Sequence, residues 1–323
     1  MKIVRLGRAY ALACRVGALD YGILTAHKPV CGGTGARSEG RENVDMAEQQ
    51  SVVVTGASRG IGRAIVRLLD RRGYRVFAGV RNDDDAESLT AEGSGRVLPI
   101  RLDVAHSASV REAGAMVRNS VQDGGIRALV NNAGIVMAGP LEGLAIDDLR
   151  RQLEVNVVGV LETTQIFLPL IRTGGGRIVN VSSVSGRVAT RFVGAYAASK
   201  FGLEGMSDAL RLELRYWGIP VVLIEPGAVK TDIWQTSRTR AADAWQSSDP
   251  AVRQRYHRVV QRMAEQTDPP ARAIGPERVA QVIARAVVAR RPRARYVVGW
   301  DARIGIAARW ALPTRVLDRL LCR

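Results

Sequence analysis

The chain has 323 residues, enough to bury a full hydrophobic core, and its 46% hydrophobic content is ordinary for a globular protein. Its formal net charge of +16 is compatible with an anionic partner or with an arginine-rich proteome, but no recognition motif for nucleic acid accompanies it, so we expect no nucleic-acid partner. The three cysteines form no motif and no run of about 18 apolar residues predicts a spanning helix, which together favour a cytoplasmic protein.

Residues 1–45 differ from the sequence that follows them. They end in a Gly-rich polar stretch, CGGTGARSEGREN, without hydrophobic periodicity, which is typical of a disordered segment. Met46 stands shortly before the first strand-like run. We therefore interpret residues 1–45 as a disordered extension or as the product of a misassigned start.

From residue 51 onward, strand-like and helix-like patterns alternate. The expected strands lie at 51–55, 75–80, 97–101, 127–131, 177–182, 220–225 and 295–299. The expected helices lie at 61–72, 107–121, 147–171, 195–217 and 276–290. Most of these strands are continuous apolar runs, which suits a parallel sheet covered on both faces. Repeated βα units predict an α/β fold with a doubly wound parallel sheet, the Rossmann fold, in a single domain over 46–300.

The first strand leads into a helix through a turn rich in glycine. In SVVVTGASRGIGRA, residues 51–64, Gly56, Gly60 and Gly62 stand where the apolar run gives way to a helical pattern. Glycines let a negatively charged group approach the unpaired N–H groups of a helix N-terminus. The spacing is G-x-x-x-G-x-G and lacks the Lys-Ser/Thr ending of a P-loop. We predict a phosphate site here rather than an ordinary Gly-rich turn.

More polar motifs follow the ends of the later strands, where doubly wound sheets bind their ligands. In chain order they are Arg81, then Asp103 with Val104, then NNAG at 131–134, SSVSG at 182–186 and PGAVKT at 226–231. The helix after SSVSG carries YAASK, which places Tyr196 and Lys200 four residues apart on one helix face.

TGASRGIG, NNAG, a serine thirteen residues before YxxxK, and PGxxxT resemble, in this order, the short-chain dehydrogenase/reductase family in its common single-domain form. Each motif alone is weak, but together and in register with the strands they are specific over about 48–300. The resemblance implies an oxidoreductase that binds a nicotinamide dinucleotide. His27, His106 and His257 stand in unrelated contexts, so we expect no metal site.

The resemblance also implies where the cofactor would lie. The pyrophosphate would rest on the glycine turn and the adenine beside Asp103 and Val104. Asn132 would contact the adenosine ribose and stabilise the central strand, while Val229 and Thr231 would hold the nicotinamide carboxamide. The full set of expected cofactor-binding residues is Gly56, Ser58, Arg59, Gly60, Ile61, Gly62, Arg81, Asp103, Val104, Asn132, Ala133, Gly134, Tyr196, Lys200, Val229 and Thr231.

The same resemblance assigns catalytic roles. Tyr196 would be the general acid in reduction and the base in oxidation, and Ser183 would hydrogen-bond the substrate oxygen. Lys200 would lower the tyrosine pKa from its usual value of about 10 and bind the nicotinamide ribose. Asn156 matches the position whose main-chain carbonyl holds a relay water, although a packing or capping role is the alternative. Ser182 competes with Ser183, but the spacing to Tyr196 favours Ser183.

The end of the second strand bears on the choice of cofactor. An acid there would bind the ribose 2′-OH of NAD. Here Val80 occupies that place, Arg81 follows it, and Arg59 lies inside the glycine turn. Two guanidiniums suit a 2′-phosphate, so we expect NADP(H) rather than NAD(H). The alternative is that Arg59 is solvated and Arg81 pairs with Asp83 or Asp84.

Segment 232–270 follows PGAVKT, where the family places its substrate lid. It contains Trp234, Trp245, Tyr256 and Met263, which favour a lipophilic pocket wall. The C-terminal portion resembles the sterol- and retinoid-handling members of the family. We therefore expect a lipophilic ketone, aldehyde or alcohol, of steroid, retinoid or lipid kind, as the substrate. The alternative function is a non-catalytic NADP(H) sensor or regulator, a class that typically lacks the tyrosine or the lysine.

Residues 301–323 predict an amphipathic helix broken at Pro313. The apolar residues after the break fall on one face: Val316, Leu317, Leu320 and Leu321. Arginine and tryptophan beside an apolar face suit peripheral contact with a membrane surface. The alternative, which we favour, is that this face covers the substrate entrance or a subunit partner. We expect a homodimer or a homotetramer.

Overall fold

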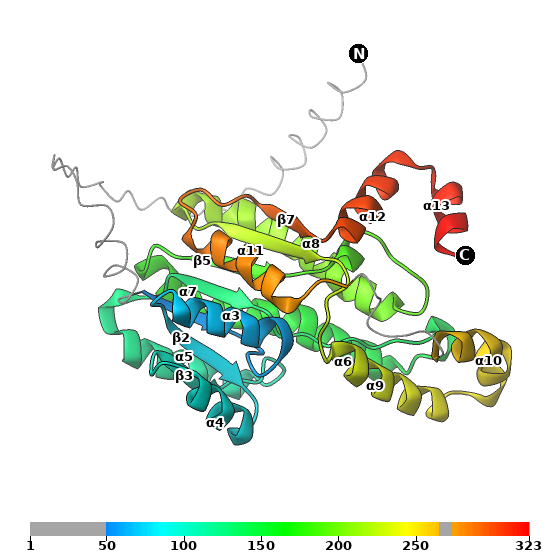
Figure 1. Ribbon diagram of the computed structural model, residues 1–323, viewed down its shortest axis with the longest axis horizontal. Coiled ribbons are helices and arrows are strands. Elements are labelled where there is room, and N and C mark those ends of the chain that lie inside the picture. Colours follow the sequence, from blue (N-terminus) through cyan, green and yellow to red (C-terminus); the bar gives the residue numbers. More distant parts are fainter. Residues whose placement is uncertain (1–49, 265–272, 323) are drawn as a thin grey trace, which may run out of the picture. The chain divides into compact units, whose positions relative to one another are not determined.

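The computed structural model describes residues 50–264 and 273–322. It contains a seven-stranded sheet in the order β3-β2-β1-β4-β5-β6-β7, and every neighbouring pair is parallel (Figure 1). The strands are β1 (Ser51–Val54), β2 (Arg75–Val80), β3 (Val97–Arg101), β4 (Ala128–Asn131), β5 (Arg177–Val181), β6 (Val221–Pro226) and β7 (Arg295–Val298). The strand order reverses between β1 and β4, which is where such sheets bind nucleotides. The predicted doubly wound α/β fold is confirmed.

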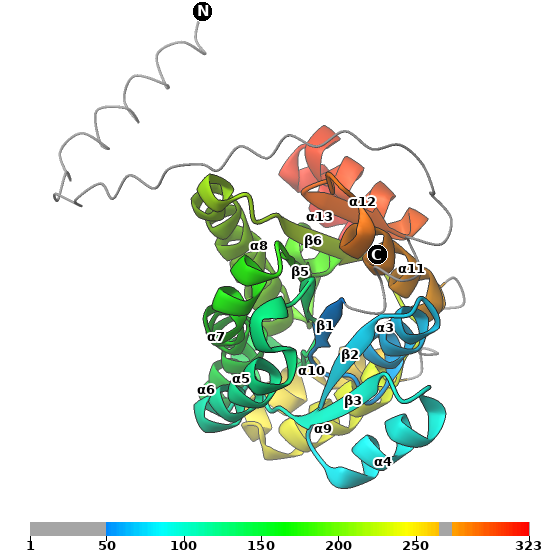
Figure 2. The same cartoon turned by 90° about the vertical axis from the view of Figure 1, so that its left-hand side faces the viewer.

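Both faces of the sheet are covered by helices (Figure 2). In β1, Val52 and Val54 pack into one core with α3 and α11, while Val53 packs into the other with α5, α7 and α8. These helices are α3 (Gly60–Arg71), α5 (Ser107–Val121), α7 (Gly159–Thr173), α8 (Gly194–Leu214) and α11 (Pro276–Val288). Successive strand residues face opposite layers, so burial of both layers explains why the strands are apolar throughout.

Helix α4 (Asp83–Glu92) was not predicted. Its sequence, DDDAESLTAE, is acidic and has little amphipathic periodicity. The Oδ1 atom of Asn82 instead caps its N-terminus by accepting a hydrogen bond from the N–H of Asp85 at 2.8 Å. The three aspartates of the first turn favour the positive end of the helix dipole. A cap and local charge thus stabilise a helix that hydrophobic periodicity does not reveal.

The helix expected at 147–171 is continuous but changes its geometry in the middle. It consists of α6 (Ile146–Leu153), the π-helical turn η3 (Glu154–Val158) and α7. By length and composition this stretch could cross a membrane, contrary to the expectation from the sequence, but half of its apolar window is buried within the fold, as in a core helix. Single π-helical turns are frequent at functional sites, and this one contains Asn156.

The segments outside the sheet layers are mostly helical. The described part of the lid forms α9 (Ile233–Ser247) and α10 (Pro250–Ala264), and the tail forms α12 (Trp300–Ala311) and α13 (Thr314–Leu321), interrupted at Leu312 and Pro313. Short helical turns lie at η1 (Gln122–Gly124), η2 (Leu141–Gly143), η4 (Val184–Gly186) and η5 (Arg215–Trp217). The predictions for residues 1–45 and for the end of the lid, 265–270, lie outside the described residues.

Candidate active site

The glycine turn between β1 and α3 has no room for side chains. Gly56 and Gly60 have φ angles of 63° and 54°, a region that favours glycine. A Cβ on Gly62 would lie 2.1 Å from the carbonyl oxygen of Gly56, and a Cβ on Gly60 would lie 3.0 Å from Cγ2 of Thr231. The turn therefore lies against PGAVKT, and no side chain among the described residues caps the N-terminus of α3 that it leads into.

The NNAG loop after β4 is bonded to the glycine turn. Asn132 Nδ2 donates to the carbonyl oxygens of Thr55 at 3.0 Å and Gly56 at 2.9 Å. Thr55 Oγ1 in turn accepts from the backbone N–H groups of Asn132 and Ala133, both at 3.0 Å. The side chain of Asn132 thus fixes the shape of the turn, in addition to any contact with a ribose.

The segment after β3 is a tight turn around Asp103. Its Oδ1 accepts from the N–H of Ala105 at 3.0 Å, and its Oδ2 lies 3.2 Å from Nδ1 of His106. The carbonyl of Val104 faces Gly159, where a Cβ would lie 2.3 Å from the Val104 oxygen. The Asp103 carboxylate is therefore oriented by its own turn and stays partly exposed, as an acceptor for an adenine amino group must be.

Ser183, Tyr196 and Lys200 are brought together behind the NNAG loop. Ser183 caps η4 by accepting from the N–H of Ser185 at 3.1 Å, and its hydroxyl is hydrogen-bonded to Tyr196. Lys200 Nζ lies 5.7 Å from the Tyr196 ring centre and donates to the carbonyl of Val181 at 2.8 Å. The NNAG loop is close by as well, since a Cβ on its last residue would lie 3.9 Å from Lys200 Nζ.

The electrostatics of this group differ from the prediction in one respect. Burial raises the pKa of Tyr196 above its usual value, and the hydrogen bond from Ser183 only opposes that rise. Burial also lowers the pKa of Lys200 to about 8, against the effect of the Glu204 carboxylate. Lys200 is not among the groups that shift the pKa of Tyr196, so the lowering that the sequence predicted is not seen.

Asn156 is completely buried in the π-helical turn η3. Its Oδ1 accepts from the N–H of Ile135 at 2.9 Å, and its Nδ2 donates to the Ile135 carbonyl and to Ser199 Oγ, both at 3.0 Å. The side chain thus joins the end of the NNAG loop to the helix that carries Tyr196 and Lys200. This is the packing role left open by the sequence, and it concerns the side chain rather than the main-chain carbonyl.

The two adjacent serines point to different neighbours. Ser183 is bonded to Tyr196, whereas the hydroxyl of Ser182 faces the carboxyl group of Glu204. A Cβ on Gly186 would lie 3.0 Å from Ser182 Oγ and 2.9 Å from Glu204 Cγ, so Ser182 is packed beneath η4. Ser183 is therefore the serine that lies beside the tyrosine.

PGAVKT connects the sheet to the lid. Val229 forms an isolated bridge with Ile274, and its carbonyl accepts from the indole Nε1 of Trp234 at 2.7 Å. Trp234 belongs to the first turn of α9. The sequence indicated this tryptophan only as part of a lipophilic wall, and its hydrogen bond to the segment expected to hold the nicotinamide could not be predicted.

Arginines gather beyond the end of β2. Arg59 and Arg81 are exposed, and among residues 50–264 and 273–322 neither makes a direct ion pair, whereas Asp83 binds Arg101 at 3.2 Å. Burial lowers the pKa of Arg240 in α9, and the charges of Arg81 and Arg151 lower it further. Positive charge therefore gathers here around Arg81 and Arg240, and the alternative pairing of Arg81 with Asp83 or Asp84 is not formed.

The tail is attached to the site by Asp301, a residue that the sequence analysis did not single out. Its Oδ2 accepts from the N–H of Ala228 at 2.8 Å. A Cβ on Gly227 would lie 2.1 Å from this carboxylate, and one on Gly299 would lie 2.4 Å from it. Asp301 was missed because Gly227 and Ala228, which it contacts, are more than seventy residues away in the sequence and so give no local signal.

Comparisons with known proteins agree with this arrangement. The family model described as short chain dehydrogenase matches residues 50–242. Human retinol dehydrogenase 16 is 37% identical over 288 residues, 87% of this chain and 90% of the relative. Human 17-beta-hydroxysteroid dehydrogenase type 6 is 35% identical over 291 residues, 88% of this chain and 91% of the relative.

Solved structures are similar as well. A short-chain dehydrogenase from Streptomyces avermitilis is 28% identical with a TM-score of 0.67, over 84% of this chain and 95% of that one. A short chain dehydrogenase from Burkholderia cenocepacia, solved in complex with NADP, is 26% identical with a TM-score of 0.66, over 84% and 97% of the two chains.

Proposed function

The chain belongs to the short-chain dehydrogenase family and is an oxidoreductase acting on CH–OH groups, and from this premise we propose that it interconverts a lipophilic ketone or aldehyde and its alcohol with NADP(H), using Tyr196 as the proton donor and acceptor. The observation that carries the proposal is the junction of Ser183, Tyr196 and Lys200 beside the glycine turn and the NNAG loop.

The glycine turn fits a dinucleotide because, within the part of the chain that the structure describes, no side chain caps the N-terminus of α3, so its first N–H groups are left for an anion. The pyrophosphate would lie on Gly56, Ser58, Gly60, Ile61 and Gly62, against the N-terminal N–H groups of α3. Asp103, Val104, Asn132, Ala133 and Gly134 would border the adenosine half. Val229 and Thr231 would face the carboxamide. When bound, a nicotinamide supplies or accepts the hydride, which no protein side chain can do.

Tyr196 would supply the proton that carbonyl reduction requires. Since the usual pKa of a phenol is about 10, Tyr196 carries its proton at neutral pH and can give it to a substrate oxygen. Ser183 would hydrogen-bond the same oxygen and orient it. The Lys200 ammonium would stabilise the phenolate left behind, and Asn156 would hold the loop and helix in register around the pair.

The preference for NADP(H) is supported by the arginines beyond β2 that make no direct ion pair with any residue that the structure describes. Arg59 and Arg81 would contact the 2′-phosphate from the turn and from the end of β2. Arg240 of the lid would add a third charge, since its neighbours are Arg81 and Arg151 rather than acids. A dianionic phosphate would relieve this mutual repulsion, whereas a 2′-hydroxyl would not.

The lid and the loop before Tyr196 supply an aromatic wall. Phe192 and Tyr256 meet edge to face with ring centres 6.3 Å apart, and Trp234 is anchored to Val229 nearby in the chain. The relatives named retinol dehydrogenase and 17-beta-hydroxysteroid dehydrogenase act on lipophilic alcohols. A substrate of that kind would cover the aromatic wall, which is the reason to propose a steroid-, retinoid- or lipid-like compound.

The decisive experiment measures NADPH and NADH oxidation across ketones, aldehydes, steroids, retinal and 3-oxoacyl thioesters, with the corresponding alcohols and oxidised cofactors in the reverse direction. We expect turnover with NADPH on lipophilic carbonyls. Tight NADPH binding without turnover on any member of the panel would favour the regulatory alternative instead. Turnover confined to small polar carbonyls would contradict the proposed substrate class.

We also propose that the protein is a homodimer or homotetramer. Several large apolar side chains of η3, α8 and η5 are exposed: Val158, Phe201, Leu212, Tyr216 and Trp217. Exposed apolar side chains on neighbouring elements favour a subunit interface. Sedimentation equilibrium of the wild type and of Leu212→Arg tests this, with dissociation expected for the variant. A wild-type monomer would contradict it.

A further inference from the structure

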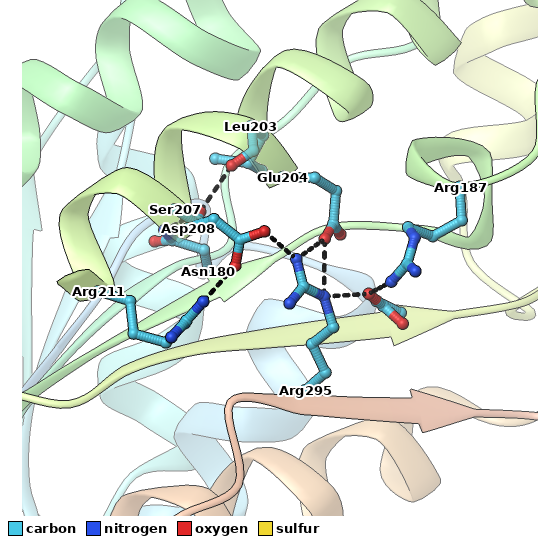
Figure 3. Close-up of polar contacts among 9 residues, drawn as sticks. Asn180, Arg187, Leu203, Glu204, Ser207, Asp208, Arg211 and Arg295 are labelled. Carbon is cyan, nitrogen blue, oxygen red and sulfur yellow. Dashed lines mark hydrogen bonds and ion pairs between the residues drawn. The ribbon is translucent and has the colours of Figure 1, made fainter. Parts of the chain in front are cut away.

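A cluster of charged side chains lies one helical turn beyond Lys200 (Figure 3). Along α8, Tyr196, Lys200, Glu204 and Asp208 follow one another every four residues and so form one stripe. Lys200 and Glu204 are each only 5% exposed. Two oppositely charged groups are therefore neighbours on a buried helix face, one of them in the proposed active site.

Arg295 of β7 is the centre of this cluster. Its guanidinium donates to Glu204 Oε2 at 3.1 Å and to Asp208 Oδ2 at 2.7 Å, and its Nε donates to Glu225 Oε1 at 3.1 Å. Figure 3 shows the guanidinium between the carboxylates of α8 and strand β6. The contacts are matched by two further arginines: Arg187 on Glu225 at 2.9 Å and Arg211 on Asp208 at 3.0 Å.

The cluster contains equal numbers of carboxylates and guanidiniums, without counting Lys200. Its carboxylates belong to Glu204, Asp208 and Glu225, and its guanidiniums to Arg187, Arg211 and Arg295. Glu225 is completely buried at the end of β6, so its charge requires these partners. Loss of one carboxylate would leave an excess positive charge close to the Lys200 ammonium.

Glu204 is the member of the cluster that acts on Lys200. Burial lowers the pKa of Lys200, and among the residues that the structure describes Glu204 is the charged group that opposes this. Burial likewise raises the pKa of Glu204 to about 7, with Glu225 adding to the rise and Ser182 and Arg295 opposing it. The carboxyl group thus ionises just below the pH range in which Lys200 loses its proton.

The packing fixes Glu204 beneath the turn that carries Ser183. A Cβ on Gly186 would lie 2.9 Å from Glu204 Cγ and 3.0 Å from the carbonyl oxygen of Lys200. The turn at Gly186 is therefore packed directly on the Glu204 side chain and on the helix backbone at Lys200, with no room for a side chain between them. The geometry therefore holds Glu204 in one place relative to both the serine turn and the lysine.

We propose that Glu204 is a positioning residue for the reaction: fixed by Arg295 as its counter-ion and one helical turn from Lys200, its carboxylate supplies the negative charge that holds the buried Lys200 side chain as an ammonium. The inference deepens the proposed function, on which it rests for the role of Lys200. It assigns the Glu204–Arg295 pair an effect on the pH range of activity, in addition to any effect on stability.

The composition of the chain makes a direct test possible. Lys2, Lys28, Lys200 and Lys230 are its only lysines, so ¹³Cε-lysine NMR of the full chain resolves few signals and Lys200→Arg assigns the one of interest. We expect Glu204→Gln to lower the titration midpoint of Lys200 by about one pH unit. Glu204→Asp, which retains the charge, should leave the midpoint near the wild-type value.

Asp208→Asn is the matched control. It removes a carboxylate from the same stripe and the same arginine, but Asp208 lies a further turn away and its side chain is 39% exposed. We expect a much smaller shift of the Lys200 midpoint. In the active enzyme, the alkaline limb of kcat/KM should move to lower pH in Glu204→Gln and stay in place in Asp208→Asn.

An unchanged Lys200 midpoint in folded Glu204→Gln, or an equal shift in Asp208→Asn, would overturn the inference. If Glu204→Gln does not fold, the wild-type titration decides: the ¹³Cδ signal of Glu204 shows where this group ionises, and a Lys200 signal that does not respond over that pH range contradicts the proposal. The NMR arm needs no turnover. A chain that is inert toward every carbonyl would therefore refute the proposed function without deciding this point.

Discussion

The cofactor edge of the sheet and the lid with its tail are built in different ways. At the cofactor edge, α3 buries five of its twelve residues. The carbonyl oxygen of Gly56 leaves no room for a side chain at Gly62 in its first turn. The lid helix α9 has no fully buried residue, and α12 and α13 bury only Ala302 and Leu317. Backbone sterics thus determine the first region, whereas a few anchors, such as Trp234 and Asp301, hold the second.

The largest expected effect concerns the chemistry that both regions serve. Tyr196→Phe removes the proposed proton donor and little else, so we expect turnover to fall by about 10²- to 10⁴-fold while NADPH affinity stays within a factor of two or three. Steady-state kinetics and fluorescence titration of NADPH measure the two quantities. A variant with a near-normal rate would exclude Tyr196 as the donor.

The adjacent serines provide the matched pair for this experiment. Ser183→Ala deletes the hydroxyl bonded to Tyr196 and should reduce turnover strongly, whereas Ser182→Ala deletes the one that faces Glu204 and should reduce it weakly. The opposite ranking would reassign the active serine.

The next largest effect is expected from a substitution that disturbs the glycine turn at the cofactor edge. In Gly62→Ala the new Cβ would lie 2.1 Å from the Gly56 oxygen, so the backbone must move, at a cost of about 1–3 kcal/mol by analogy with overpacked cores. We expect NADPH affinity to fall at least tenfold and the melting temperature to drop. Gly205→Ala in α8 is the control, because its Cβ would meet nothing within 4 Å and alanine favours a helix. Equal effects of the two substitutions would show that the close approach at Gly62 is unimportant.

The difference between regions shaped by the local backbone and regions held by distant anchors also explains which features could be predicted from the sequence. The doubly wound parallel sheet and the strand limits within a residue or so were predictable because short apolar runs and the glycine spacing constrain the backbone directly. The polar motifs were predictable at one edge of the sheet because each follows the end of a strand. Helix α4 was missed because an Asn82 cap and acids stabilise it without periodicity. Asp301 was missed because its partners, Gly227 and Ala228, are distant in sequence.

The pKa of Tyr196 was not predictable for a related reason. Its direction depends on the balance between burial and the neighbouring charge, and burial is a property of the packed structure. The position of Lys200 four residues along the helix indicated a favourable charge but not how much water the fold removes. Spacing identifies which groups meet, whereas their ionisation depends on the completed core.

A third prediction tests where the two regions meet, at the arginines beyond β2. Arg81→Gln should weaken NADPH binding by about 1–3 kcal/mol, roughly 5- to 150-fold, through loss of a charge-assisted contact, and should leave NADH binding nearly unchanged. Arg101→Gln at the end of β3 is the control, because Arg101 is already paired with Asp83. Isothermal titration with both cofactors measures the difference. Equal losses for NADPH and NADH would show that Arg81 does not contact the 2′-phosphate.

A smaller effect is expected from the anchor of the tail. Asp301→Ala removes the acceptor of the Ala228 N–H and should loosen PGAVKT, raising the KM for NADPH about 3- to 10-fold, which is the scale of one hydrogen bond. Asp318→Ala, in the exposed part of α13, should have no such effect. If both variants retain the wild-type KM, the tail is attached to the site without influencing it.

The smallest expected effect distinguishes the two roles proposed for the tail itself. Its helices expose Ile304, Trp310 and Leu320 at 58%, 78% and 52%, and arginines stand beside them. Yet the tail also lies against the site, because Gly305 approaches Val184 and Arg191 Nη1 donates to the carbonyl of Cys322 at 3.2 Å.

An apolar face directed at the substrate entrance or at a second subunit needs no membrane, so we expect at most weak binding to anionic vesicles. Co-sedimentation with phosphatidylserine vesicles, with and without residues 301–323 and at two salt concentrations, measures it. Strong binding that salt weakens and truncation abolishes would make the tail a membrane contact, since screening weakens attraction to a charged surface but not the packing of a lid.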